Sequence, residues 1–144
     1  VVPLVISGTI VDRAGRPVRD VALHVYQTDA KGQYTPEKPM DEPHARLAGF
    51  LTTPDGHFEL RTIRPGGYTQ TVRLGDQDRH IPPHIHIEIT CPGHAERRVQ
   101  VVFADDPLLA DPYWADWVAK LRQPVVTVTR DGATWLGRLV ISLD

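Results

Sequence analysis

The sequence predicts an all-β fold, an antiparallel β-sandwich with one short helix near residues 112–121. Three observations lead to this prediction: short β-rich runs recur along the chain, Gly, Pro and Asp turns separate them, and helical periodicity is nearly absent. The length of 144 residues is that of one ordinary domain. We therefore expect a single domain over residues 1–144.

The first two strands are expected at residues 5–11 and 21–27. In both runs apolar residues alternate with other residues, so that they share one face of the strand. A turn containing Gly and Pro joins the two runs, and we expect them to pair as a hairpin. Residues 29–46 are polar and include three prolines, which predicts a long irregular loop of the kind that often carries function.

The middle of the chain predicts a second hairpin and then another pair of strands. Residues 49–53 and 57–63 flank an Asp-Gly turn, which is a frequent hairpin connection. Residues 84–90 and 98–103 follow as two strands joined across Cys91-Pro92-Gly93.

The C-terminal part predicts the helix and the last two strands. Asp111 can cap a helix and Pro112 suits its first position, so residues 112–121 are the helical candidate. Residues 125–129 and 136–143 then close the sheet around an Arg-Asp-Gly turn. Together these elements indicate an immunoglobulin- or transthyretin-like topology.

Composition and charge exclude several classes of protein. Apolar residues make up 41% and charged residues 24% of the chain, as in globular proteins and unlike disordered ones. The formal charge of −2, with Lys and Arg scattered, predicts no nucleic-acid partner. The apolar stretches are far shorter than a membrane helix, which predicts no membrane partner. We expect a soluble protein, cytoplasmic or exported after loss of a leader that the given sequence does not contain.

Two histidines, His84 and His86, stand at i and i+2 on a predicted strand. Alternate residues of a strand point to one face, so these two lie roughly 6.6 Å apart along the backbone and can converge on one ion, while Ile85 faces the other way. Taken alone, such a pair is more often a polar patch on an exposed strand. A zinc site with His94 or Cys91 as a further ligand is an alternative from the residues alone.

Five segments of the chain carry a more specific pattern. They are Gly8-Thr9-Ile10-Val11-Asp12 with Gly15-Arg16-Pro17-Val18, then Tyr26-Gln27-Thr28-Asp29-Ala30-Lys31-Gly32-Gln33-Tyr34, Thr62-Ile63-Arg64-Pro65-Gly66-Gly67-Tyr68, Pro82-Pro83-His84-Ile85-His86, and Gln100-Val101-Val102-Phe103-Ala104-Asp105-Asp106-Pro107. In this order they resemble the intradiol ring-cleavage dioxygenases, the catechol and protocatechuate 3,4-dioxygenase group. A single segment would be unspecific, whereas five in the right order are a specific match.

The resemblance implies a mononuclear non-haem Fe(III), one per chain, held by Tyr34, Tyr68, His84 and His86. Tyr68 and His86 would be axial ligands and the other two equatorial, with water or hydroxide in the fifth position. Two tyrosinates would stabilise the ferric state, and the phenols can ionise at neutral pH only if a cation holds them. Residues 1–144 would then form an intradiol dioxygenase-like catalytic core.

The implied function is an oxidoreductase that incorporates both atoms of O2 into a catecholic ring, cleaving it between its two hydroxyls. The product would be of the cis,cis-muconate type, and the phenolate of Tyr68 would take up a substrate proton. Several positions depart from the family pattern. The family has an Arg three residues before the first His, where this chain has Ile81, and Arg79 or Arg73 is expected to serve instead. Gln100 keeps a position near the oxygen pocket of the family, so Tyr68, Gln100 and Arg79 are the expected catalytic residues.

Two alternatives to the dioxygenase stay open. One is a metal-free β-sandwich of transthyretin type that serves as a binding module, and the other keeps the metal but does not activate O2. The substrate is also open between catechol, protocatechuate and hydroxyquinol. Tyr113, Trp114 and Trp117 either anchor a homo-oligomer interface or pack the helix on its own sheet.

Overall fold

Strands make up most of the secondary structure. The computed structural model describes residues 2–72 and 77–144. In chain order the strands are β1 (Pro3–Val11), β2 (Val21–Gln27), β3 (Leu47–Thr53), β4 (His57–Ile63), β5 (Tyr68–Val72), β6 (Gln77–Ile81), β7 (His84–Thr90), β8 (Arg97–Phe103), β9 (Val125–Val126), β10 (Val128–Asp131) and β11 (Thr134–Ser142). The helical segments are η1 (Glu42–His44), η2 (Pro107–Ala110) and α1 (Pro112–Leu121).

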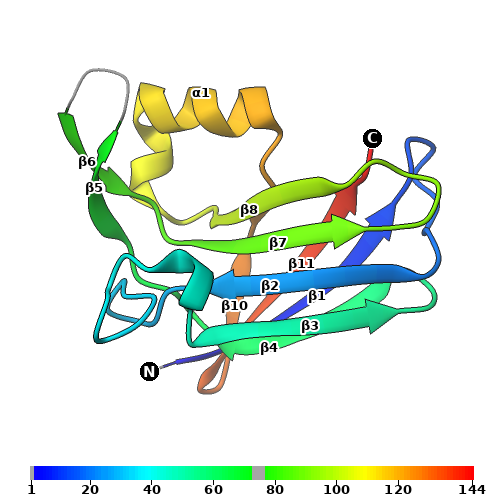
Figure 1. Cartoon of the computed structure of the whole chain (residues 1–144), viewed down its shortest axis with the longest axis horizontal. Helices are drawn as coiled ribbons and strands as arrows, with labels where there is room; N and C mark the ends of the chain where they lie inside the picture. The colour runs from blue at the N-terminus through cyan, green and yellow to red at the C-terminus, as the bar shows by residue number, and fades with distance from the viewer. Residues whose placement is uncertain (1, 73–76) are drawn as a thin grey trace.

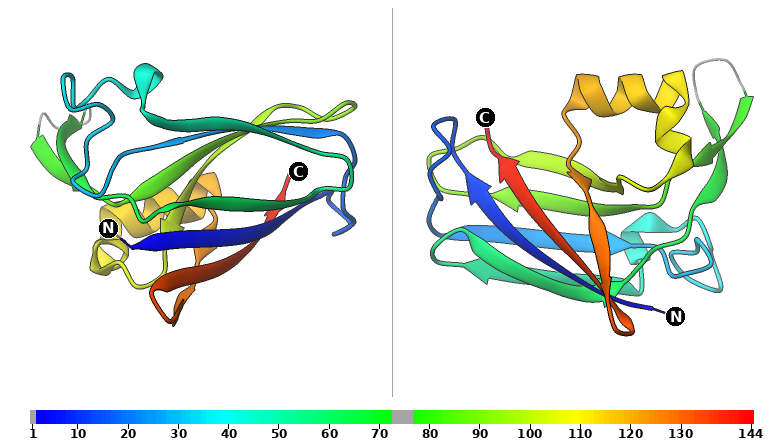
Figure 2. Two further views of the ribbon diagram at one scale, coloured as in Figure 1. Left: turned by 90° about the horizontal axis from the view of Figure 1, so that it is seen from below. Right: turned by 180° about the vertical axis from the view of Figure 1, so that it is seen from behind.

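Two sheets lie face to face, as Figures 1 and 2 show. One has the strand order β10-β11-β1-β4 and the other the order β3-β2-β7-β8-β9, while β5 and β6 form a separate hairpin. Most pairs are antiparallel, but β1–β11 and β8–β9 are parallel. This architecture confirms the predicted all-β sandwich.

The hydrophobic core lies between the two sheets. Its most buried members include Leu4, Ile6 and Ile10 of β1 and Ile85, Ile87 and Ile89 of β7, each at most 1% exposed. These residues alternate along their strands because successive side chains point to opposite faces of a sheet. Strand β7 therefore turns His84 and His86 away from the core.

The two hairpins predicted in the first half of the chain are wrong. β1 pairs with β4 and β11, whereas β2 pairs with β3 and β7, so neither β1–β2 nor β3–β4 is a hydrogen-bonded pair. The chain crosses between the sheets at the Asp-Gly turn, where Gly56 has a φ of 84° and an added Cβ would lie 2.6 Å from the Val18 carbonyl. Alternation shows which face of a strand is buried but not which sheet the strand joins.

Later elements follow the predictions more closely, with one correction. The single strand expected at residues 125–129 is divided into β9, which pairs with β8, and β10, which pairs with β11 in the other sheet. β7 and β8 pair in antiparallel register across the Cys91 turn, and β10 pairs with β11. Helix α1 has the predicted bounds, and the Asp111 carboxylate accepts a hydrogen bond from the Tyr113 backbone N–H at 2.9 Å. The β5–β6 hairpin is an element that the sequence did not predict.

The loop after β2, the helix η1 and the β5–β6 hairpin gather at one end of the five-stranded sheet, beside the start of β7 (Figure 1). Helix α1 lies alongside β8 near this end (Figures 1 and 2). Within residues 2–72 and 77–144, no helix has the length and apolarity needed to cross a bilayer. The predicted metal ligands lie on the loop after β2, on β5 and at the start of β7.

Candidate metal centre

Strand β7 supplies the two histidines. His84 and His86 are 4% and 8% exposed, and they lie on the face opposite to the core residues of the same strand. The register places His86 between Tyr26 of β2 and Gln100 of β8. Because both neighbouring strands are paired along their length, the imidazoles project from a rigid part of the sheet.

The loop after β2 supplies Tyr34, which is 3% exposed. A turn shapes the approach to it: the Asp29 carboxylate accepts hydrogen bonds from the backbone N–H groups of Lys31 and Gln33 at 2.9 and 3.0 Å. Gly32 follows with a φ of 80°, a conformation that favours glycine. This turn directs the Tyr34 side chain back over the sheet toward β7.

Tyr68 is the first residue of β5, and the segment before it is tied to the Tyr34 loop. The Gln27 side chain donates to the Ile63 carbonyl at 2.9 Å and accepts from the Thr62 hydroxyl at 2.8 Å. The Gly66 N–H donates to the Asp29 carbonyl at 2.8 Å. These bonds explain why the two tyrosine segments contain Gln and Thr at these positions, whereas the Asp29 carboxylate is needed for the turn before Tyr34.

Two glycines allow the tyrosine segments to touch. A Cβ added to Gly32 would lie 2.1 Å from the Gly67 carbonyl oxygen, and a Cβ added to Gly66 would lie 2.5 Å from the Ala30 carbonyl oxygen. Side chains at these positions would separate the two backbones. The glycines therefore set the distance between Tyr34 and Tyr68.

The structure brings the four predicted ligands together. The Tyr34 hydroxyl lies 3.3 Å from the Tyr68 hydroxyl, 3.4 Å from His84 Nε2 and 3.2 Å from His86 Nε2. The two Nε2 atoms are 3.0 Å apart. The Tyr34 hydroxyl thus contacts the other three donor atoms, and the four come from three stretches of chain.

The other imidazole nitrogen of His84 fixes its tautomer. Nδ1 lies 2.7 Å from the Pro82 carbonyl oxygen, so the Nδ1–H donates there and Nε2 presents a lone pair to the cluster. His86 is held differently, because its ring stacks on Tyr26 with 4.4 Å between centroids and an interplanar angle of 8°. Both rings are therefore oriented with Nε2 toward the phenols.

Burial controls the protonation of the cluster. It lowers the pKa of His84, and together with the neighbouring His84 it lowers the pKa of His86 to about 3, so both imidazoles are neutral at pH 7. Burial also raises the pKa of both phenols, and the hydrogen bond with Tyr68 adds to the effect at Tyr34. Without a cation the phenols keep their protons, whereas a cation bound among them would reverse this shift.

A cavity of about 360 Å³ opens beside the cluster. Its walls include the ligand candidates Tyr68, His84 and His86, the predicted catalytic residue Gln100, and a carboxylate, Glu42. The remaining walls are Gln70, Ile81, Tyr113, Trp114 and Trp117. The cavity is thus bounded by the four-donor cluster on one side and by aromatic side chains of α1 on another.

Arg79 lies at the border of this cavity without lining it. Its guanidinium stacks over the Tyr113 ring, with Cζ 4.1 Å from the ring centroid, and its Nε is buried without a hydrogen-bond partner. The structure therefore brings Arg79 to a wall residue but not to the four donors. Arg73, the other arginine considered from the sequence, lies outside the described residues.

Sequence reasoning missed Glu42 and Tyr26 as parts of the site. Glu42 Oε1 lies 3.7 Å from His86 Nε2, although its sequence position in a Pro-rich loop shows no relation to the histidines. Tyr26 belongs to a resembling segment, and its place opposite His86 follows once β2 and β7 are known to pair. Sequence spacing could not identify Glu42, and Tyr26 could be identified only with the strand order known.

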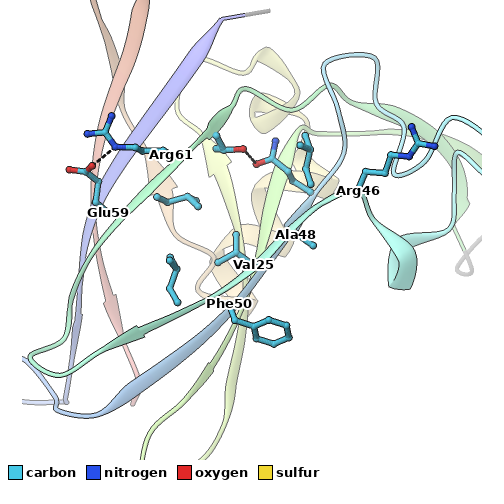
Figure 3. Close-up of a pocket in the computed structure, with 12 residues that line it drawn as sticks. Val25, Arg46, Ala48, Phe50, Glu59 and Arg61 are labelled. Atoms are coloured by element: carbon cyan, nitrogen blue, oxygen red, sulfur yellow. Dashed lines mark hydrogen bonds and ion pairs between the residues drawn. The ribbon is translucent and has the colours of Figure 1, made fainter.

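A second hollow is separate from the cluster. It measures about 450 Å³ and lies between β3 and β4, the two strands that part at the crossing turn. Figure 3 shows Val25 within it, the Glu59–Arg61 ion pair on one side and Arg46 on the other. None of the four donor residues lines it, so it has no part in the candidate metal centre.

The donor set differs from the commonest protein metal sites. Over the described part of the chain, no group of three or more His, Cys, Asp or Glu side chains is placed to hold a metal ion. The zinc alternative with His94 or Cys91 therefore has no support from the structure. The cluster described above combines two imidazoles with two phenols instead.

Comparison with known proteins gives consistent matches. The sequence profile of the family described as Dioxygenase matches residues 1–134. Catechol 1,2-dioxygenase of Acinetobacter baylyi is 31% identical over 76% of this chain and 39% of its own, and the protocatechuate 3,4-dioxygenase beta chain of Burkholderia cepacia is 31% identical over 76% and 48%. The chain thus spans less than half the length of these curated relatives.

A solved structure matches over nearly the whole chain. It is the dioxygenase domain of a dioxygenase and carbohydrate-binding protein fusion from Streptomyces sp. SirexAA-E, with a TM-score of 0.70 and 28% identity. The match covers 99% of this chain and 80% of that one.

Proposed function

Because the chain belongs to the intradiol ring-cleavage dioxygenase family, we propose that it incorporates both atoms of O2 into a catecholic ring. The ring is cleaved between its two hydroxyls to give a cis,cis-muconate-type diacid. The observation that carries this proposal is that the Tyr34 hydroxyl lies 3.2–3.4 Å from the donor atoms of Tyr68, His84 and His86, with the two histidine Nε2 atoms 3.0 Å apart.

The donor set fits one Fe(III) per chain. Two ligands held at about 2.0–2.1 Å from one ion, at right or tetrahedral angles, lie about 2.8–3.4 Å apart, and the separations of Tyr34 from the other three donors and of the two histidines fall in this range. Phenolate oxygens are hard anionic donors that suit a trivalent ion, and neutral imidazoles complete the set. When bound, ferric iron would supply a Lewis acid that draws electron density from a catecholate.

The protein's own groups provide binding and proton transfer. Tyr68 lines the cavity, and a phenolate formed there when a cation is bound would be placed to take up a catechol hydroxyl proton. Gln100 presents its side chain to the same cavity from the strand next to His86. Trp114 and its aromatic neighbours exclude water and orient a planar ring by stacking.

Metal analysis joined to a visible spectrum tests the proposal. Iron-loaded protein should contain one iron per chain and be red, because tyrosinate-to-iron charge transfer absorbs visible light. Oxygen consumption with catechol, protocatechuate and hydroxyquinol should accompany formation of a muconate-type product. A colourless protein that does not retain iron would contradict the proposal.

A second function, binding of a catechol without O2 activation, is favoured by one feature. The apolar side chain of Ile81 lines the cavity at the position where the family has an arginine, and Arg79 is engaged with Tyr113. A change of the visible spectrum on adding catechol, without oxygen consumption, would support this second function over the first.

A further inference from the structure

Glu42 places a carboxylate at the rim of the candidate site. It belongs to the short helix η1 and lines the cavity beside the four-donor cluster, as well as a smaller cavity that it shares with His24, Tyr26 and Glu88. Its Oε1 is 3.7 Å from His86 Nε2. A carboxylate thus forms part of the wall of the space that a ligand would enter.

The other walls of the cavity do not neutralise this charge. Among its described lining residues there is no lysine or arginine, and Arg79 stacks on the Tyr113 ring without lining the space. The aromatic walls from α1 include Trp114 and Trp117, whose rings meet edge to face with 5.4 Å between centroids. Aromatic faces accept apolar and cationic groups, and the amide walls Gln70 and Gln100 can hydrogen-bond a carboxylate but carry no positive charge to offset Glu42.

We propose that Glu42 makes this site select catechols with neutral or cationic ring substituents and disfavour catechols that carry a carboxylate. The inference rests on the proposed function and names its substrate class. A substrate carboxylate in the cavity would face the Glu42 carboxylate at short range, whereas an ammonium group would be attracted to it and to the indole rings. The Glu42 side chain is 41% exposed, so solvent screening limits the effect to about 3- to 10-fold in affinity.

Binding of three catechols to iron-loaded protein tests this proposal. The probes are 4-methylcatechol, protocatechuate and dopamine, which are neutral, anionic and cationic at the ring substituent. Their dissociation constants are measured without oxygen from the change in the visible spectrum, and their kcat/KM values from oxygen consumption. Wild-type protein, Glu42→Gln and Glu37→Gln are compared. Glu37 lies in the same loop, pairs with Arg46 and does not line the cavity, so its variant makes the same charge change away from the site.

Relative to 4-methylcatechol, Glu42→Gln should tighten protocatechuate and weaken dopamine by about 3- to 10-fold each, while Glu37→Gln changes neither ratio. Opposite shifts for the two charged probes cannot come from a change of cavity shape alone. In wild-type protein the dissociation constants of protocatechuate and dopamine, each divided by that of 4-methylcatechol, should also move toward unity as salt is raised. Unchanged ratios in Glu42→Gln would overturn the inference, and so would loss of iron in that variant, which would make Glu42 a ligand.

The two proposals fail in different ways. Charge-dependent binding without oxygen consumption would leave the selectivity of Glu42 standing and overturn the dioxygenase. Oxygen consumption with ratios that do not respond to Glu42→Gln would overturn the selectivity of Glu42 and leave the dioxygenase standing.

Discussion

The two tyrosines of the cluster differ in their surroundings. Tyr34 is 3% exposed and its hydroxyl contacts all three other donors, whereas Tyr68 also lines the cavity. Tyr34 is therefore placed to hold an ion, and Tyr68 is placed both to hold it and to meet a substrate.

Replacing each phenol should separate these roles. We expect Tyr34→Phe to lose most of its iron and its visible band, because it removes the donor shared by the whole cluster. Tyr68→Phe should retain iron with a weaker, shifted band and should lose at least about tenfold in kcat/KM, because the cavity-facing base is absent. Iron content, the visible spectrum and oxygen consumption measure these effects.

The control is Tyr113→Phe, which changes a cavity-wall residue that is not one of the four donors and should keep the wild-type spectrum. An unaltered spectrum in Tyr68→Phe would remove it from the ligand set.

The buried His86 should make metal-free protein sensitive to acid. Burial and His84 lower its pKa to about 3 in the folded state, whereas an unfolded histidine has a pKa of about 6.5. Between these values the unfolded chain binds the proton and the folded chain does not, so the stabilising contribution is complete above pH 6.5 and is lost as the pH falls toward 3. About 2 kcal/mol of unfolding free energy should be lost between pH 8 and pH 5.

Urea unfolding of chelator-treated protein at the two pH values measures this loss. His86→Gln should lose less between pH 8 and pH 5 than wild type. His44→Gln alters an exposed histidine paired with Asp41 and should keep the wild-type dependence. Equal pH dependence in wild type and His86→Gln would show that His86 is not the group responsible.

Individual site residues were predictable where a short motif carried them. His84 and His86 follow from strand alternation, and Tyr34 and Tyr68 follow from segments that resemble the family. Glu42 was not predictable, because its position depends on how a loop folds back over β7, and no local pattern encodes that contact.

The element that brings the two phenols together is the Tyr34 loop packed on the segment before β5. Gly32 is the tightest point of this packing, and its φ of 80° is nearly the same as the 82° of Gly15, which has no atom within 4 Å of an added Cβ. The two glycines therefore share a backbone conformation and differ in packing.

This pair provides a matched test of the loop contact. Gly15→Ala should cost about 1–2 kcal/mol of unfolding free energy from the left-handed conformation alone. Gly32→Ala should cost at least about 1–2 kcal/mol more, because its Cβ meets the Gly67 carbonyl oxygen, and it should also reduce iron retention. Denaturant unfolding and metal analysis measure the two effects. Similar losses in both variants, with full iron content, would show that the contact does not position the phenols.

Prediction of the elements succeeded where pairing is local. The β7–β8 pair, the β10–β11 pair and helix α1 are joined or capped by nearby residues, so turn and cap patterns were sufficient. The hairpins expected in the first half failed because each of their strands joins a different sheet. That choice depends on contacts distant in sequence, such as the parallel pairing of β1 with β11.

At the scale of the whole molecule, the core and the candidate site are separate. The core lies between the two sheets, and the site lies on the other face of β7, at the end where the Tyr34 loop and the β5–β6 hairpin meet. We expect the sandwich to fold around its core without the metal. Iron would then link the Tyr34 loop, the start of β5 and β7.

Iron should therefore stabilise the molecule unevenly. A ligand that binds only the folded state adds RT ln(1 + [L]/Kd), which is about 2.7 kcal/mol at a hundredfold excess over Kd. Hydrogen exchange of iron-loaded and metal-free protein locates this gain. Amides of residues 28–46 and 63–70 should exchange at least about tenfold more slowly with iron, because local opening there would release a ligand. Amides of β1 and β11 should change less, since these strands open with the core and touch no ligand.

The control is the double variant His84→Ala with His86→Ala, which should abolish the difference at the loop. Equal slowing across the whole chain would mean that the loop has no opening of its own and that the site and the sandwich unfold as one unit.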